Sequence, residues 1–206
     1  MRAVILSGGC IADYEFLRVQ IKDDDVIICA DSGYNHAVKM NLAVNTVVGD
    51  FDSIGDNNIP ENIRTIRVPA NKDLTDTELA LQYAQGVGFK NFLLLAATGS
   101  RMDHSLANIL LLKGIVERGE NAVILDEHNK IMMTNSMLEL YEPEFSTVSL
   151  LPLSDCYGVS TEGLEYPLCN AALLMGASLG VSNVMVSEYA KVSVNKGLLL
   201  VIVARD

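Results

Sequence analysis

The sequence predicts a parallel α/β domain followed by an all-β domain, and three observations on the 206-residue chain predict this fold class. In the first 125 residues, short apolar runs alternate with segments of helical periodicity. After about residue 130, short runs follow one another closely, with turn residues between them. Half of the residues are apolar and 20% are charged, a composition that excludes a disordered chain.

Six short apolar runs in the first part have the character of buried parallel strands, because they are continuous and rich in β-branched residues. Strand–helix alternation of this kind builds right-handed crossovers, so these runs should form one parallel sheet. The expected strands are residues 3–6, 26–30, 46–48, 63–68, 92–97 and 122–125.

Helical patterns lie between these runs. Thr75 followed by Glu78 forms a capping box, which predicts the start of a helix. Residues 103–118 carry apolar side chains at helical spacing and are followed by Gly119. Residues 14–21 and 34–40 are weaker helix candidates.

The pattern in the last part of the chain predicts strands and no clear helix, although residues 171–180 are ambiguous between strand and helix. Asn195-Lys196-Gly197 has the composition of a hairpin loop that joins residues 192–194 to the last strand. We therefore predict a Rossmann-like parallel α/β/α domain over residues 1–128 and a β-sandwich domain over residues 129–206. The expected strands are residues 130–134, 137–141, 146–151, 157–161, 182–187, 190–194 and 198–203.

Charge and cysteine usage exclude several function classes. The net charge is −11, which argues against broad nucleic-acid binding and against attraction to an anionic membrane. The apolar runs, residues 92–97 among them, are too short to cross a bilayer. The four cysteines are scattered without C-x-x-C spacing, which disfavours a zinc site and indicates a reducing, cytoplasmic location.

Aspartates follow the expected strands one after another. Ligands of open parallel sheets bind at the carboxyl ends of the strands, and parallel strands place these ends at one edge. Up to six carboxylates should therefore converge there. They are Asp31, Asp50, Asp52, Asp73, Asp76 and Asp103.

Such a carboxylate cluster is unfavourable without a cation, since two like charges about 4 Å apart repel by roughly 4 kcal/mol near a protein surface. Oxygen ligands without nearby His or Cys suit Mg²⁺. Asp50 and Asp52 should face the same way, because side chains two apart in an extended segment do so. Helix capping explains Asp31 or Asp103 equally well when each is taken alone.

The same edge carries loops suited to phosphate. Backbone N–H groups of residues 7–9 and 98–100 can approach an anion, and Arg101 supplies a fork of donors. The G-x-x-x-x-G-K-[ST] and G-x-G-x-x-G motifs are absent. His104 is interpreted as a hydrogen-bonding neighbour, and no arrangement for covalent catalysis stands out.

Five segments together resemble the successive motifs of thiamine pyrophosphokinases, in order and in spacing. The resemblance covers nearly the whole chain. It departs from the family at Tyr166, where many members have Trp, and after Asn183, where an acidic residue is common. The segments are residues 30–33 (ADSG) followed by Asn35, residues 49–53 (GDFDS), 72–76 (KDLTD) and 98–104 (TGSRMDH), and, in the β unit, residues 160–168, 182–183 and 192–199 taken together.

The resemblance implies a homodimer in which the α/β domain binds ATP and Mg²⁺ and the β-sandwich domain helps to hold thiamine across the dimer interface. The implied reaction moves the pyrophosphoryl group of ATP to thiamine, with thiamine diphosphate and AMP as products. By motif match, Asp31, Asp50, Asp52 and Asp76 would bind the metal. Asp73, Thr75, Thr98, Gly99 and Arg101 would bind ATP, and Asp103 would support the nucleotide or the substrate. Ser160, Thr161 and Tyr166 would line the thiamine pocket.

Catalysis would then consist of positioning and charge neutralisation, with Arg101 acting on the phosphates and Asp73 or Asp76 receiving the hydroxyl proton. Two other functions stay open. One is a kinase or pyrophosphokinase of another small alcohol, which the acidic edge would serve equally well. The other is a non-catalytic sensor of nucleotide or thiamine, against which the intact acidic motifs argue. A plain interaction domain would leave the acidic edge unexplained.

Overall fold

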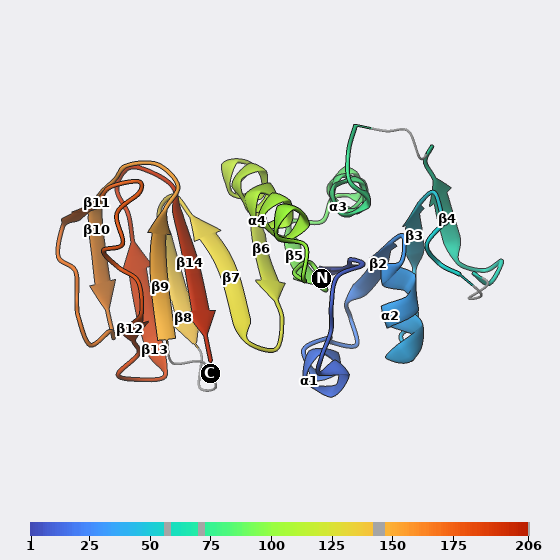
Figure 1. Cartoon of the computed structure of the whole chain (residues 1–206), viewed down its shortest axis with the longest axis horizontal. Helices are drawn as coiled ribbons and strands as arrows, with labels where there is room; N and C mark the ends of the chain where they lie inside the picture. Colours follow the sequence, from blue (N-terminus) through green and yellow to red (C-terminus); the bar gives the residue numbers. More distant parts are fainter. Residues whose placement is uncertain (56–58, 70–72, 142–146, 206) are drawn as a thin grey trace. The chain divides into compact units, whose positions relative to one another are not determined.

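The computed structural model describes residues 1–55, 59–69, 73–141 and 147–205. Lys72 of the third motif lies outside these residues. The chain divides into two compact units, one made of residues 1–111 and 119–127 and the other of residues 112–118 and 128–206. Each unit is described below by itself (Figure 1).

The first unit contains six parallel strands in the order β6-β5-β1-β2-β3-β4. The chain starts at the middle of this order, proceeds outward to β4, and then returns to the other side of β1 with β5. The strands are β1 (Ala3–Leu6), β2 (Val26–Ala30), β3 (Thr46–Gly49), β4 (Arg64–Arg67), β5 (Asn91–Leu95) and β6 (Asn121–Leu125).

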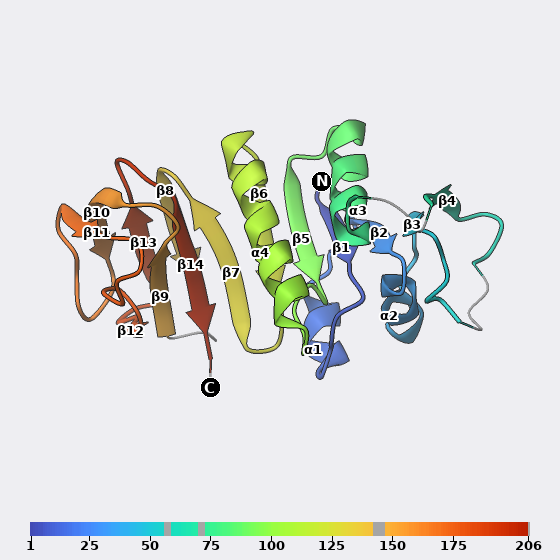
Figure 2. The same ribbon diagram turned by 45° about the horizontal axis from the view of Figure 1, so that its top comes forward.

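Helices cover both faces of these strands. Every residue of β1 is buried, as a strand enclosed on both sides requires. Helix α3 packs against β1, β2 and β3, whereas α2 packs against β1 and β2. Figures 1 and 2 show α3 and α2 on opposite faces. The helices are α1 (Tyr14–Val19), α2 (Gly33–Lys39), α3 (Asp76–Val87) and α4 (Met102–Glu117).

The helix boundaries follow local chemistry. The Thr75 hydroxyl accepts a hydrogen bond from the Glu78 N–H at 3.2 Å, so the predicted cap of α3 is confirmed. Gly88 ends this helix in the left-handed region at φ 104°, where a glycine is least strained. The N-cap residue of α2 is Ser32, so Asp31 is not its cap.

The second unit contains antiparallel strands in two sets, β12-β9-β14-β7 and β11-β10-β13-β8. The expected strand over 182–187 is shorter than predicted, at two residues, and the ambiguous segment over 171–180 contains one strand of three residues. The strands are β7 (Asn129–Thr134), β8 (Met137–Tyr141), β9 (Thr147–Pro152), β10 (Cys156–Glu162), β11 (Ala171–Leu173), β12 (Asn183–Val184), β13 (Tyr189–Ser193) and β14 (Leu199–Ala204).

The predicted hairpin at residues 195–197 is wrong. Strand β13 pairs with β10 and β8, whereas β14 pairs with β7 and β9, so the two strands belong to different sets. The connecting residues pair elsewhere, since the Tyr157 N–H donates to the Lys196 carbonyl at 2.8 Å. Turn composition predicts the change of direction but not the strand that follows it.

None of the described helices is long and apolar enough to cross a membrane.

Candidate active site

A cavity of about 530 Å³ opens at the carboxyl ends of the parallel strands. Its walls include residues 7–10, which follow β1, and residues 96–101, which follow β5. These neighbouring strands are where the chain changes its direction of travel through the sheet. Such a switch point separates two loops that leave in opposite directions, and it is the general binding place of open α/β sheets.

The two loops are attached to each other by backbone hydrogen bonds. The Gly9 N–H donates to the Ala96 carbonyl at 2.8 Å, and the Cys10 N–H donates to the Thr98 carbonyl at 3.0 Å. The Gly99 N–H donates to the Ser105 hydroxyl at 3.0 Å. The expectation that the N–H groups of these glycines face an anion is therefore wrong for Gly9 and Gly99, because protein acceptors occupy them.

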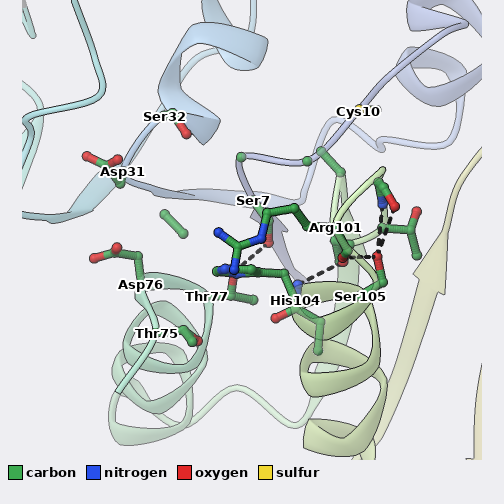
Figure 3. A pocket seen from close by; sticks show the side chains of 18 of the residues that line it. Ser7, Cys10, Asp31, Ser32, Thr75, Asp76, Thr77, Arg101, His104 and Ser105 are labelled. Carbon is green, nitrogen blue, oxygen red and sulfur yellow. Dashed lines mark hydrogen bonds between the residues drawn. The ribbon is translucent and has the colours of Figure 1, made fainter. Parts of the chain in front are cut away.

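Two polar side chains at the start of α4 hold the second loop. The Asn108 amide is buried and donates to the Ala97 carbonyl at 2.7 Å. The Ser105 hydroxyl, also buried, donates to the Arg101 carbonyl at 3.0 Å. Sequence analysis missed both residues, although their signal was present as polar positions three apart on a helix with an otherwise apolar face. Figure 3 shows Ser105 beside this loop.

A buried pair of hydroxyl groups lies at the loop that follows β1. The Thr77 hydroxyl in α3 bonds the Ser7 hydroxyl at 2.9 Å, and both residues are buried. Thr77 was also missed, since a single Thr inside a helical pattern carries no distinguishing signal. This bond joins α3 to the loop after β1.

Three of the six predicted carboxylates come together. Ligand oxygens of Asp31, Asp50 and Asp52 lie within 4.8 Å of one another. Asp76 lines the cavity together with Asp31, and Figure 3 shows both on one side of it, across from Ser105. Asp73 and Asp103 are exposed, and neither is among the residues that line the cavity.

Asp50 and Asp52 meet for a reason that differs from the predicted one. Phe51 has φ 71°, in the left-handed region, so this segment is a turn and not an extended strand. The Arg67 guanidinium lies 4.7 Å from the centre of the Phe51 ring, and its Nη1 donates to the Asp50 carbonyl at 3.1 Å. The neighbouring strand β4 thus supports a strained backbone next to the acidic cluster.

Asp31 is the buried member of the cluster, with 8% of its surface exposed and φ 44°. Burial raises the pKa of its carboxyl group, and the negative charges of Asp76 and Asp50 raise it further, against hydrogen bonds from Ser53 and Ser32 that lower it. Its Oδ1 is buried and has no hydrogen-bond partner among the described residues.

These features fit a bound divalent cation. A buried carboxylate oxygen without a donor is costly, and a cation would satisfy it. The donor set consists of oxygens alone, which suits Mg²⁺ and not zinc. The cluster at Asp31, Asp50 and Asp52 is thus the group of described residues that can hold the metal.

Two threonines predicted at the nucleotide already have partners for their hydroxyl groups. The Thr75 hydroxyl caps α3, and the Thr98 hydroxyl donates to Asp126 at 2.8 Å. Both residues line the cavity together with Gly99. Thr98 therefore lines the cavity, and its hydroxyl hydrogen already forms a hydrogen bond with a carboxylate.

Arg101 lines the cavity, and its guanidinium forms an ion pair with Asp103 in the first turn of α4. Both side chains are well exposed, at 69% and 65%. Hydrogen bonding from Arg101 lowers the pKa of Asp103 to about 2, so this carboxylate stays charged throughout the neutral range. His104 lines the cavity as well.

The three residues predicted at thiamine belong to the second unit and surround one loop. The Thr161 hydroxyl accepts from the Leu168 N–H at 2.8 Å, and the Ser160 hydroxyl accepts from the Asn170 N–H at 2.9 Å. Buried Asn183 holds Tyr166 at both backbone groups, at 3.1 and 2.7 Å. The Tyr166 side chain is 66% exposed. The loop is thus fixed while its aromatic side chain stays accessible.

Gly9→Ala should disrupt the cavity. A methyl group at this position would lie 2.2 Å from the Thr98 carbonyl oxygen and 2.3 Å from that of Ala96, so the two loops would have to separate. We expect a loss of about 1–3 kcal/mol in the free energy of unfolding, measured by chemical denaturation. The control Gly86→Ala meets open space inside α3 and should stabilise by about 0.5–1 kcal/mol. Equal stability of Gly9→Ala and the parent would contradict the close approach.

Comparison with known proteins agrees with this geometry. Residues 17–124 match the family "Thiamin pyrophosphokinase, catalytic domain", and residues 135–199 match "Thiamin pyrophosphokinase, vitamin B1 binding domain". The thiamine pyrophosphokinase of Bacillus subtilis (strain 168) is 32% identical over 165 residues, which are 77% of each chain. Thiamin pyrophosphokinase 1 of Caenorhabditis elegans is 25% identical over 170 residues, 76% of this chain and 70% of that protein.

Solved structures show the same likeness over the full length. The crystal structure of the Bacillus subtilis thiamine pyrophosphokinase has a TM-score of 0.89 at 25% identity and covers 100% of both chains. That of thiamin pyrophosphokinase from Geobacillus thermodenitrificans has a TM-score of 0.87 at 25% identity, covering 100% of this chain and 98% of that one. With both of its domains matched and its acidic motifs in place, this chain belongs to the thiamin pyrophosphokinase family.

Proposed function

We propose that this enzyme transfers the pyrophosphoryl group of ATP to thiamine and releases thiamine diphosphate and AMP. One observation carries the proposal. In a chain matched over both domains of the family, Asp31, Asp50 and Asp52 converge beside a cavity at the switch point of the parallel strands. A carboxylate group next to a pocket of this kind suits a nucleotide polyphosphate with its cation.

We assign the metal to Asp31, Asp50 and Asp52, with Mg²⁺ as the ion. When bound, Mg²⁺ neutralises phosphate charge and orients the polyphosphate for in-line attack. The enzyme's own part is to hold three carboxylates in place before the substrates arrive. The turn at Phe51 and the left-handed backbone of Asp31 provide this arrangement.

In the reaction, the hydroxyethyl oxygen of thiamine attacks the β-phosphorus of ATP. The bond from this phosphorus to the oxygen bridging to the α-phosphorus breaks, and AMP leaves with that oxygen. Arg101 donates to the phosphates as their charge develops. Of the two candidates for the hydroxyl proton, Asp76 lines the cavity and Asp73 does not, so we assign the proton to Asp76. Thr75, Thr98 and Gly99 shape the cavity wall, and Asp103 orients Arg101.

The two units would have different roles in the reaction. We propose that residues 1–128 form a Rossmann-like catalytic domain, supported by parallel strands with helices on both faces. Residues 129–206 would form a β-sandwich that binds thiamine through the loop around Tyr166, supported by its two antiparallel strand sets and its match to the vitamin B1 binding domain.

We also propose a cytoplasmic homodimer. All four cysteines are free thiols, which fits a reducing compartment. One face of α4 exposes Met102, Leu106 and Leu110 at four-residue spacing, and an apolar face of this kind suits a second subunit. Light scattering on the purified protein measures the subunit number directly.

Tyr166→Ala should weaken thiamine binding selectively. The exposed ring can stack on the cationic ring of thiamine, an interaction worth about 0.5–2 kcal/mol, so we expect the KM for thiamine to rise about tenfold with an unchanged KM for ATP. Tyr141→Ala is the matched control, because Tyr141 is 65% exposed in the same unit. A rise in the KM for ATP alone would remove Tyr166 from the thiamine site.

The proposed function is tested by incubating the protein with ATP, Mg²⁺ and thiamine and separating the nucleotides. AMP formed in step with thiamine diphosphate supports the proposal. ADP would indicate transfer of a single phosphoryl group. The absence of any thiamine-dependent turnover would favour a sensor or a different acceptor alcohol.

A further inference from the structure

A chain of hydrogen bonds joins Tyr14, His36 and the backbone of Gly9. Tyr14 Oη lies 2.7 Å from His36 Nδ1, and His36 Nε2 lies 2.9 Å from the Gly9 carbonyl oxygen. A carbonyl oxygen only accepts, so Nε2 carries the hydrogen, and Nδ1 of the neutral ring accepts from the tyrosine hydroxyl. The direction of both bonds is therefore fixed, from Tyr14 through His36 to Gly9.

The other polar groups around Gly9 are bonded to the segment after β5. The Gly9 N–H donates to Ala96, and the N–H of the Gly9–Cys10 peptide donates to Thr98. The carbonyl of that peptide is the group that His36 binds. Helix α2 on one side and the β5 loop on the other thus anchor a peptide that lines the cavity.

The His36 ring is held in place by its surroundings. It is half-buried, and its centre lies 5.8 Å from that of the Tyr14 ring in a tilted contact. Burial lowers the pKa of His36, which favours the neutral ring that this bonding pattern requires. Lys39 Nζ lies 5.5 Å from the centre of the Tyr14 ring, so the tyrosine contacts Lys39 as well as His36.

We propose that His36 is a positioning residue for the nucleotide, which holds the carbonyl end of the Gly9–Cys10 peptide while Thr98 holds its N–H, and so keeps the first loop in the conformation that receives the phosphates of ATP. Without the bond to His36, the carbonyl group of this peptide would be free to tilt toward an anion in the cavity and repel it. Tyr14 supports this role by fixing the ring and its tautomer. The inference rests on the proposed function, since that function makes ATP the ligand of the cavity.

Two variants of nearly equal size separate the bond to Gly9 from the bulk of the ring. His36→Gln keeps a side-chain N–H at about the distance of Nε2. His36→Asn places its amide near Nδ1 and leaves the Gly9 carbonyl without its donor. We expect His36→Asn to raise the KM for ATP about tenfold, with kcat and the KM for thiamine within about twofold, and His36→Gln to restore most of the affinity.

Tyr14→Phe should show a smaller change in the KM for ATP, in the same direction. Tyr83→Phe is its control, because the Tyr83 hydroxyl bonds Thr46 in the same unit and does not line the cavity. Thermal unfolding of every variant checks that the fold is retained. A loss of folded protein alone would lower the apparent turnover and leave the KM for ATP and the KM for thiamine unchanged, which distinguishes it from a positioning effect.

The inference is overturned if His36→Asn leaves the KM for ATP unchanged, if it alters the KM for thiamine equally, or if His36→Gln is no better than His36→Asn. Each of these results leaves the proposed function standing. If the parent protein forms no AMP with thiamine, that function fails, and calorimetry with Mg-ATP then decides about His36. Weaker binding by His36→Asn than by His36→Gln supports the inference, and no binding by the parent overturns it.

Discussion

Asp31→Asn should lower turnover about a hundredfold and also stabilise the metal-free protein. The lost carboxylate belongs to the cluster that we assign to Mg²⁺, and metal ions contribute several kcal/mol of charge stabilisation, with each 1.36 kcal/mol giving a tenfold change in rate. Steady-state formation of AMP measures the loss. Asp52→Asn, at the exposed member of the cluster, should lower turnover in the same direction and leave the protein folded.

The gain in stability follows from the sign of the pKa shift at Asp31. Burial, together with Asp76 and Asp50, raises the pKa of this carboxyl group in the folded protein. Its contribution to stability is therefore fully present below pH 4, the range of an ordinary Asp, and is lost as the pH rises through the folded pKa. At pH 7 the charge destabilises the fold. Asn removes the charge and tolerates the left-handed backbone at φ 44°.

In EDTA at pH 7 we expect Asp31→Asn to be more stable by roughly 1 kcal/mol, a rise of about 2–4 °C in Tm for a chain of this size. Magnesium should reduce or reverse the difference, because binding stabilises only the parent, by about 2.7 kcal/mol at a hundred times the Kd. Asp24→Asn, an exposed acid outside the cluster, is the control and should change neither quantity. Lower stability of Asp31→Asn in EDTA would contradict repulsion within the cluster.

Arg101→Met should lower kcat/KM for ATP about a hundredfold without affecting the fold. Arg101 carries the one permanent positive charge among the described residues that line the cavity, and charge-assisted bonds to developing phosphate charge are among the strongest that a side chain offers. Its side chain is well exposed, so its removal leaves the core intact. The kcat/KM for ATP of Arg101→Lys should lie between those of the parent and of Arg101→Met, since Lys keeps the charge but not the planar fork of donors.

Asp103 provides the companion measurement for Arg101. Because its pKa is about 2, the ion pair persists across the neutral range, and ATP shares Arg101 with Asp103. We expect Asp103→Asn to lower kcat/KM for ATP by about threefold to tenfold, less than Arg101→Met, because Asp103 orients the guanidinium toward the phosphates. Unchanged ATP kinetics in Arg101→Met would exclude a phosphate role for this residue.

Much of the first unit could be predicted from the sequence because its strands are continuous apolar runs. The expected strands at residues 3–6, 26–30 and 122–125 start and end within one residue of β1, β2 and β6. The cap at Thr75 also followed from the sequence, since capping is a local interaction between residues three apart. Periodicity and local hydrogen bonding are properties that a short segment carries by itself.

The second unit was harder, because strand pairing is a long-range choice. Strands β13 and β14 are separated by a turn-like segment, yet they pair with partners up to 75 residues away in sequence number. The segment over 171–180 has one short strand, β11. Many short β segments of similar composition compete for the same partners, so composition alone does not select the register.

The site also contains features that the sequence predicts and features that it does not. The sequence predicted the ligand candidates Asp31, Asp50 and Asp52, since acids that follow parallel strands gather at one edge of the sheet. It did not predict the turn at Phe51, because the left-handed backbone of this residue is supported by contacts such as that with Arg67 from another strand. The helical pattern of α4 marks Ser105 and Asn108 as polar positions, but no sequence pattern identifies the carbonyl groups that they bind. The same holds for the Gly9 carbonyl that His36 binds.

By itself, the sequence determined the parallel α/β character of the first unit, the succession of strand-end acids, and the motifs that place the chain in its family. The tertiary structure decided that β5 lies next to β1, that the cavity opens between the loops after these two strands, and which hydroxyl and N–H groups are already bonded there. The physical reason is range: hydrophobic period and caps act over a few residues, whereas strand order and buried polar contacts join segments separated by most of the unit.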